Sequence, residues 1–462
     1  MQDSRDVLDR VERERETYLD ELKDYLRIPS ISTDPAYDAE VRRCADWLLE
    51  RMRDAGLDAR LIEGEGKPLV YGEHLGAGPD KPTILFYGHY DVQPPDPLDE
   101  WRHPPFEPTI EGERLIARGA TDDKGQSYVH LKAVAAVLAE RGALPCNVKF
   151  LIEGEEESGG EHIECFVRAD GGEHLACDAV FISDSAMFGK GQPSLIYGLK
   201  GMAYLELRVD GPSHDLHSGG YGGQVRNPAN ALCSIIASLH DPTTGRVAIE
   251  GFYDRVLDLS DAERAEAARL PFDEDGMRAD IDVTELVGED GYSTIERRWA
   301  RPTCDVNGMW SGYLGEGAKT IIPAYAAAKI SMRLVPDQDP VEIEDAFVRH
   351  VEAHAPAGVR TSVTRHHGGR AVLVDLEGPI VEAAEQAMAD EWARPYRVRE
   401  GGSIPIVSTF AEVLEKPVIL LGLGLEDDRL HSPNEKFDIP QFYGGIRALV
   451  RFLDRLADVE AT

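Results

Sequence analysis

The sequence predicts an α/β protein in which a mostly parallel sheet flanked by helices is interrupted by an inserted α+β domain. Residues 125–141 have the apolar spacing of a helix, as do residues 7–26 and 38–55. Short apolar runs predict buried strands at residues 83–87, 147–152 and 179–182. Strands that alternate with helices are typical of a parallel sheet covered on both faces.

The middle of the chain has a different pattern. Residues 202–209 and 321–335 alternate between apolar and polar, as in strands with one exposed face. Helical stretches lie near residues 227–240 and 339–354, and the acidic stretch 254–291 is expected to be a solvated helix and loop. This segment therefore indicates a smaller domain with an antiparallel sheet.

The α/β pattern returns after residue 371. A helix at residues 378–392 is followed by a strand at 417–421 and a final helix near 440–457. We therefore expect one α/β domain, formed by residues 1–198 and 372–462, that is interrupted by an inserted domain at residues 199–371.

The balance of charge excludes some classes of partner. The chain has 84 acidic and 49 basic residues, a net charge of −35, and a surface this acidic repels nucleic acid and anionic lipid. The six cysteines form no CxxC pair, which indicates reduced, mostly buried thiols. No run of about 18 apolar residues and no signal-peptide core is found, so we expect a cytoplasmic protein without a membrane span.

Metal-type side chains follow several of the predicted strands. After the strand at 83–87, residues 89 and 91 would point to the same side, so that Asp91 could hydrogen-bond the imidazole of His89. Two adjacent aspartates, Asp122 and Asp123, precede a helix, and either carboxylate could bridge two cations. The alternatives are a surface turn for the first motif and an aspartate helix cap for the second.

An acidic run at residues 153–160 follows the strand at 147–152. Like charges packed together repel unless a cation neutralises them, so one carboxylate could bind metal while its neighbour acts as a general base. The alternative is a solvated acidic loop. Asp184 and His431 also lie after predicted strands, and each is ordinary alone.

Together these clusters supply histidine and carboxylate ligands for two divalent ions that share one carboxylate. Mixed nitrogen and oxygen ligands suit Zn²⁺, and Mn²⁺ or Co²⁺ also fit. Ligands tend to collect at the carboxyl ends of strands in such sheets. We therefore predict two divalent metal ions per subunit at this edge of the sheet.

Six motifs, in order, resemble those of the dinuclear zinc exopeptidases that include carboxypeptidase G2 and aminoacylase, and the branch of carnosine dipeptidase and cytosolic non-specific dipeptidase is the most similar. The motifs are GHYDVQP, RGATDDKG, EGEEESGG, HSGGYGG, EGGSIPI and HSPNEK. The resemblance implies a zinc-exopeptidase-like fold, with residues 199–371 as a lid and dimerisation domain and the remainder as the catalytic domain. It also implies a homodimer formed through the lid.

The resemblance further implies roles for individual residues. Asp122 bridges both metals through a peptide to Asp123 that is cis, Asp91 supports catalysis behind the imidazole, and Glu156 is the general base. Glu155 stands where relatives often carry a hydrophobic residue. The implied metal ligands are His89, Asp122, Glu157, Asp184 and His431.

In the inserted domain, the resemblance makes His217 an oxyanion-stabilising donor that reaches the neighbouring subunit's active site. Arg333 would bind the substrate carboxylate, and Asn307, Ser403 and the glycines at 401–402 would contribute further substrate contacts. The implied reaction is metal-dependent hydrolysis of dipeptides or very short peptides with a free C-terminal carboxylate. The alternatives are a deacylase of N-acetyl or N-succinyl amino acids with the same metal site, and a non-catalytic metal-binding homologue.

Overall fold

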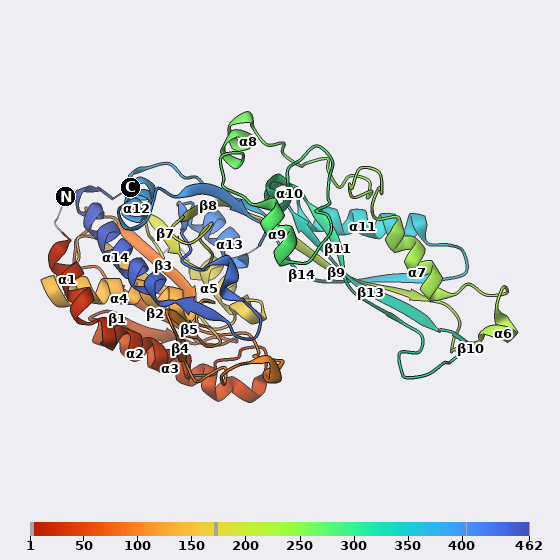
Figure 1. The fold of residues 1–462 in the computed structure, drawn as a ribbon, viewed down its shortest axis with the longest axis horizontal. Coiled ribbons are helices and arrows are strands. Elements are labelled where there is room, and N and C mark those ends of the chain that lie inside the picture. Colours follow the sequence, from red (N-terminus) through yellow and green to blue (C-terminus); the bar gives the residue numbers. More distant parts are fainter. Residues whose placement is uncertain (1–3, 171–173, 403, 462) are drawn as a thin grey trace. The chain divides into compact units, whose positions relative to one another are not determined.

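The computed structural model describes residues 4–170, 174–402 and 404–461 (Figure 1). The chain forms two compact units. The first comprises Met1–Tyr197, Val374–Val398 and Thr409–Thr462, and the second comprises Gly198–Leu373 and Arg399–Ser408. The sequence pattern assigned residues 399–408 to the α/β domain. In the structure they belong to the second unit.

Most strands of a nine-stranded mixed sheet lie in the first unit. Its central strands β6, β3, β7 and β17 are parallel, and antiparallel strands complete both sides. The predicted fold class is therefore confirmed. In spatial order the strands are β1 (Asp58–Ile62), β2 (Leu69–His74), β6 (Asn147–Glu153), β3 (Thr83–His89), β7 (Ala179–Ile182), β17 (Val418–Leu420), β8 (Ser194–Leu199) and β15 (Val372–Leu373), with β16 (Tyr396–Glu400) paired to β8.

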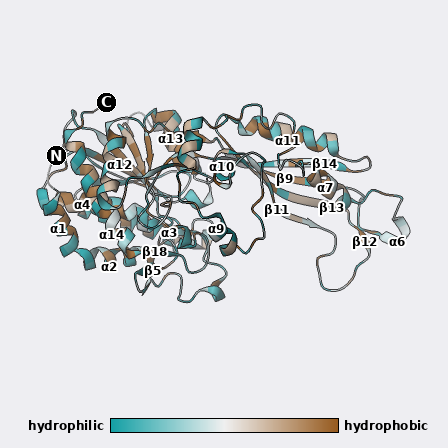
Figure 2. Cartoon of the chain, turned by 45° about the horizontal axis from the view of Figure 1, so that its top comes forward, coloured by the Kyte–Doolittle hydropathy of each residue, from teal (hydrophilic) through white to brown (hydrophobic). Residues whose placement is uncertain are grey.

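Helices cover this sheet because successive residues of its central strands point to opposite faces and are apolar, so both faces need to be buried. On β3, Phe86 stacks on Phe150 within the larger core, whereas its neighbour Tyr87 contacts Phe410 of α13. Figure 2 shows that α1 contains both hydrophilic and hydrophobic residues, and its Val7 and Val11 are buried. The helices are α1 (Arg5–Arg13), α2 (Arg15–Leu26), α3 (Asp38–Asp54), α4 (Lys124–Arg141), α5 (Glu161–Asp170), α12 (Pro379–Glu391), α13 (Pro405–Leu414) and α14 (Ile439–Arg455).

A small antiparallel sheet connects two motifs that are far apart in the sequence. Its strands, in order, are β18 (Lys436–Asp438), β5 (Arg114–Ile116) and β4 (Thr109–Glu111). Pairing of Lys436 with Ile116 places the loop before β18 beside the loop that follows β5 and leads into α4. This pairing brings the HSPNEK and RGATDDKG motifs together.

The second unit contains a four-stranded antiparallel sheet, as the alternating sequence pattern predicts. Its order is β11 (Thr303–Ser311), β13 (Tyr325–Leu334), β9 (Gly201–Asp210) and β14 (Arg360–Gly369). Helices α7 (Pro228–Ala237) and α11 (Pro340–His354) pack on it, and their apolar residues share its core. Shorter elements are β10 (Leu216–His217), α6 (Ser218–Tyr221), α8 (Asp261–Ala267), α9 (Glu274–Asp280), α10 (Thr294–Ala300) and β12 (Ile321–Ile322).

Among the described residues, no helix combines the length and apolarity that crossing a bilayer requires.

Candidate metal centre

Three of the predicted metal ligands lie at or just beyond the carboxyl ends of the parallel strands. His89 is the last residue of β3, and Asp184 lies two residues beyond β7. The loop after β6 contains a short 3₁₀ helix, Glu156–Ser158, that carries Glu157. Asp122 and His431 lie in the two loops that the β5–β18 pairing holds side by side. A parallel sheet brings such loops to one edge, where α/β proteins bind ligands.

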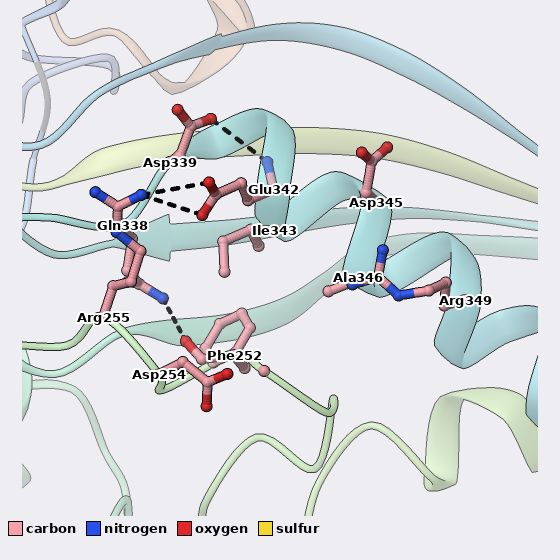
Figure 3. A pocket seen from close by; sticks show the side chains of 11 residues that line it. Phe252, Asp254, Arg255, Gln338, Asp339, Glu342, Ile343, Asp345, Ala346 and Arg349 are labelled. Carbon is pink, nitrogen blue, oxygen red and sulfur yellow. Dashed lines mark hydrogen bonds and ion pairs between the residues drawn. The ribbon is translucent and has the colours of Figure 1, made fainter.

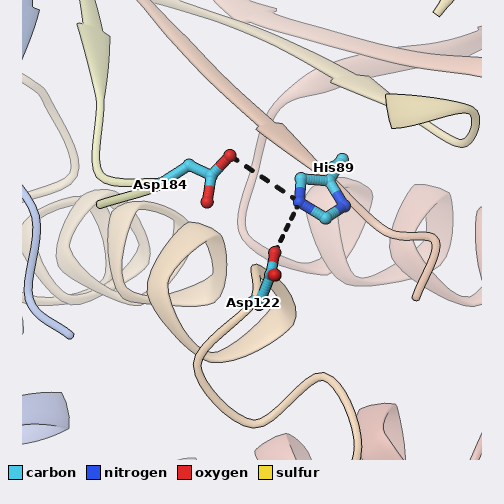
Figure 4. Close-up of side chains that lie close together, drawn as sticks. All are labelled: His89, Asp122 and Asp184. Atoms are coloured by element: carbon cyan, nitrogen blue, oxygen red, sulfur yellow. Dashed lines mark hydrogen bonds and ion pairs between the residues drawn. The ribbon is translucent and has the colours of Figure 1, made fainter. Parts of the chain in front are cut away.

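The five predicted ligands form two clusters that share Asp122. In the first, His89 Nε2 lies 3.1 Å from Asp122 Oδ1 and 3.8 Å from Asp184 Oδ2 (Figure 4). In the second, His431 Nε2 lies 3.0 Å from Asp122 Oδ2 and 3.4 Å from Glu157 Oε2. Within each cluster the candidate ligand atoms all lie within 4.8 Å of one another. Each oxygen of Asp122 therefore faces a different cluster, which is the arrangement that a bridging carboxylate requires.

Asp91 lies behind the imidazole of His89. His89 Nδ1 is 3.0 Å from the backbone carbonyl of Asp91 and 3.3 Å from its Oδ1, so the main chain is the closer acceptor. A proton held at Nδ1 by these acceptors would leave the lone pair of Nε2 for a cation bound together with Asp122 and Asp184. The Asp91 carboxylate also accepts hydrogen bonds from the backbone N–H groups of Glu156, at 3.3 Å, and Glu157, at 3.1 Å.

Two supporting residues escaped the sequence analysis. Gln93 Nε2 donates a hydrogen bond to Glu157 Oε2 at 2.7 Å, and Glu435 accepts hydrogen bonds from the backbone of Gly119, Thr121 and Asp122 at 3.0–3.1 Å. Gln93 lies within the motif GHYDVQP and Glu435 within HSPNEK, so their place in the family motifs was the sequence signal that could have identified them.

The loop that carries Asp122 is held from its interior. Glu435 is fully buried and forms an ion pair with the equally buried Arg118, with Nη1 and Oε2 2.8 Å apart. The peptide between Asp122 and Asp123 is cis, as the family resemblance implied. One buried carboxylate therefore fixes the backbone on which the shared ligand stands.

The predicted residues of the inserted domain lie in the second unit. His217 ends β10, and its Nδ1 accepts hydrogen bonds from the backbone of Gly219 and Gly220. Arg333 lies on β13, paired with Thr303 of β11, and Asn307 lies at a bulge in β11. Ser403 lies outside the described residues.

The second unit also contains a hollow of about 370 Å³ beside the start of α11 (Figure 3). Two polar contacts shape it: Arg255 Nη1 lies 3.3 Å from both carboxylate oxygens of Glu342, and Gln338 donates to the backbone carbonyl of Phe252 at 2.7 Å. None of the predicted site residues that the structure describes lines this hollow, so we assign it no part in the metal centre.

Comparison with known proteins identifies the family. The model of peptidase family M20/M25/M40 matches residues 85–455, which is most of the chain. The chain belongs to peptidase family M20/M25/M40. The exopeptidase family predicted from the motifs is thereby confirmed.

Full-length relatives place this M20 chain near named dipeptidases. It is 32% identical over 465 residues to the Cys-Gly metallodipeptidase dug1 of Schizosaccharomyces pombe, with 97% of each chain covered. It is 30% identical over 470 residues to the human Beta-Ala-His dipeptidase, covering 98% of this chain and 92% of that protein. The solved structure of the dipeptidase Dug1p from Saccharomyces cerevisiae matches with a TM-score of 0.87 at 30% identity, with 98% of each chain covered.

The electrostatics of the M20 centre reflect its crowded carboxylates. Burial, together with Asp122, raises the pKa of Glu157 to about 9 and that of Asp184 to about 6. Burial also raises the pKa of Glu156 well above its usual value, with Asp184 and Glu157 adding to the rise. Burial opposes ionisation of Asp122, but hydrogen bonds with His431 and His89 outweigh it and lower the pKa of Asp122. A cation would remove the repulsion that disfavours the charged carboxylates.

Metal binding is expected to release protons near neutral pH. Because the pKa of Glu157 is raised to about 9, this side chain holds a proton near pH 7 that a cation must displace. The apparent affinity for Zn²⁺ should therefore rise with pH between the pKa of Asp184, about 6, and that of Glu157, about 9. Calorimetric titration in buffers of different ionisation enthalpy measures the proton count.

Glu157→Gln is the control, because it removes the titrating group and should lower the number of protons released. A pH-independent affinity with no proton release would contradict this electrostatic description.

Proposed function

We propose that the chain is a metal-dependent dipeptidase that cleaves the amide bond of dipeptides or very short peptides with a free C-terminal carboxylate. The observation that carries the proposal is the pair of ligand clusters joined by Asp122. The Schizosaccharomyces pombe and human relatives described above match over nearly the whole chain and are named as dipeptidases, the former as a metallodipeptidase.

Two divalent cations fit the donor set. His89 and Asp184 would hold one, Glu157 and His431 the other, and Asp122 both. Two imidazoles and three carboxylates suit Zn²⁺ first, with Mn²⁺ and Co²⁺ as alternatives. When bound, the cations would polarise the scissile carbonyl and lower the pKa of the attacking water.

The chain's own residues would move the proton. Glu156 accepts a proton from the attacking water and then donates it to the leaving amine, so that one carboxyl serves both steps. Burial raises the pKa of Glu156, so its ionised carboxylate binds a proton more strongly than that of an exposed glutamate. The hydrogen bond from the backbone of Glu156 to Asp91 fixes the loop that carries this base.

Residues of the second unit are proposed to bind the substrate. Arg333 would pair its planar guanidinium with the substrate carboxylate in a bidentate fashion. His217 would donate a hydrogen bond to the developing oxyanion, because acceptance at Nδ1 leaves the ring proton at Nε2. Asn307 and Ser403 are proposed as further contacts.

We also propose that residues 199–371 act as a lid and mediate a homodimer. β11 is an edge strand of its sheet, and its Val306 and Met309 are 40% and 55% exposed. An unprotected apolar edge favours pairing with a second chain. Light scattering tests this proposal, which predicts the mass of a dimer and is contradicted by that of a monomer.

The six free cysteines fit the cytoplasmic location that we propose.

A panel of substrates separates the proposed dipeptidase from a deacylase. With Zn²⁺ or Mn²⁺ restored after chelation, we expect hydrolysis of Xaa-Gly dipeptides and carnosine, and little of N-acetyl or N-succinyl amino acids. Amidating the C-terminus should slow the reaction, because the carboxylate that Arg333 would bind is removed. Cleavage of the N-acyl amino acids alone would establish the deacylase, and no turnover with any substrate or metal would sink both.

Replacing Glu156 by glutamine tests the proposed base. We expect kcat to fall by about 10²–10⁴-fold, the usual contribution of general acid–base catalysis, while the metal content stays unchanged. Glu155→Gln is the matched control, because it neutralises the adjacent acid of the same motif and should retain most activity. Full turnover by the Glu156→Gln enzyme would refute the assignment.

A further inference from the structure

We propose that Ser32 is a positioning residue for the metal centre that acts through Asp91. The inference rests on the proposed function, which makes the Asp91–His89 pair and Glu156 parts of the catalytic machinery. Ser32 Oγ donates a hydrogen bond to Asp91 Oδ2 at 2.6 Å. Ser32 is 7% exposed and Asp91 is fully buried, so water does not compete freely for this contact.

The segment that carries Ser32 is fixed beside the loop after β3. The backbone N–H of Val92 donates to the carbonyl of Ser30 at 3.0 Å, and Ile31 and Val92 form a parallel bridge. Ser30 Oγ donates to the backbone carbonyl of Tyr90 at 2.6 Å. The hydroxyl of Ser32 therefore approaches Asp91 from a backbone that is itself anchored.

The same segment is also tied to the loop of the shared ligand. Lys124, two residues after Asp122, is fully buried, and its Nζ donates to the carbonyls of Tyr25 at 3.2 Å and Ile28 at 2.7 Å. The Tyr25 carbonyl lies in the last turn of α2, and the Ile28 carbonyl lies two residues beyond its end. Residues 25–32 thus contact the loops of His89 and of Asp122, although they contribute no ligand.

The geometry of Asp91 explains why one hydroxyl matters. Rotation about the last bond of an aspartate is broad, so its donors decide which oxygen faces which neighbour. Oδ1 lies beside His89 Nδ1 and the N–H of Glu156, and Oδ2 accepts from Ser32 and the N–H of Glu157. The two glutamate N–H groups belong to the loop that Asp91 must orient. Ser32 supplies a short, charge-assisted bond from outside that loop.

The test compares Ser32→Ala with matched variants. We expect Ser32→Ala to lower kcat by about 10–100-fold with little change in KM, and to weaken Zn²⁺ binding by about 10-fold in competition with a chromophoric chelator, as is typical for the partners of metal ligands. Ser32→Thr keeps the donor and should restore both values. Ser194→Ala is the control, because it removes a buried hydroxyl on β8, outside residues 25–32 and the loops of the metal centre.

Wild-type kcat and Zn²⁺ affinity in Ser32→Ala would overturn the inference, as would equal losses in Ser194→Ala, which would indicate a general effect of removing a buried hydroxyl. If Ser32→Ala does not fold, Ser32→Cys supplies the comparison, since it keeps the size and donates only weakly. The affinity measurement needs no turnover. A wild-type chain that cleaves no dipeptide would therefore refute the proposed function, while weaker Zn²⁺ binding by Ser32→Ala would still support the positioning role.

Discussion

Repulsion among crowded, partly buried carboxylates is the constraint on which the centre of this protein depends. Asp122, Glu156, Glu157 and Asp184 crowd one edge of the parallel sheet, and burial raises the pKa of three of them. Folding alone does not favour such an arrangement, because each charge loses its water and faces other charges. The proposed cations supply the compensating positive charge, so the site is organised around what it binds.

The scaffold meets this constraint by fixing backbone rather than by adding opposite charges at the centre. The carboxylate of Glu435 accepts hydrogen bonds from the backbone N–H groups of the loop of Asp122. The carboxylate of Asp91 does the same for the loop of Glu156 and Glu157. Arg118 pairs with Glu435 away from the ligand atoms. The loop of Asp122 and the loop of Glu156 and Glu157 are thus each held by a buried carboxylate that is itself outside the ligand set.

Much of the fold could be predicted from local pattern. The apolar runs that became β3, β6 and β7 are buried on both faces, and the alternation of β9 matches its half-buried position. Other strands carried no such signal: β16 has the sequence YRVRE and β14 begins RTSVTR, so their extended state depends on the strands they pair with. The helix expected at residues 7–26 is two helices that meet at Glu14. The candidate ligands could be predicted because side chains that bind metal form a residue-type pattern, and the family motifs selected among the adjacent acids. Ser32, Gln93 and Glu435 act through hydrogen bonds that only the folded chain defines.

Anomalous X-ray scattering from crystals grown with Zn²⁺ tests the dinuclear centre most directly. Two zinc peaks should appear in each subunit, one beside His89 and Asp184 and one beside Glu157 and His431, with Asp122 contacting both. A single peak, or two peaks that do not share Asp122, would contradict the proposed centre and the hydrolytic chemistry built on it.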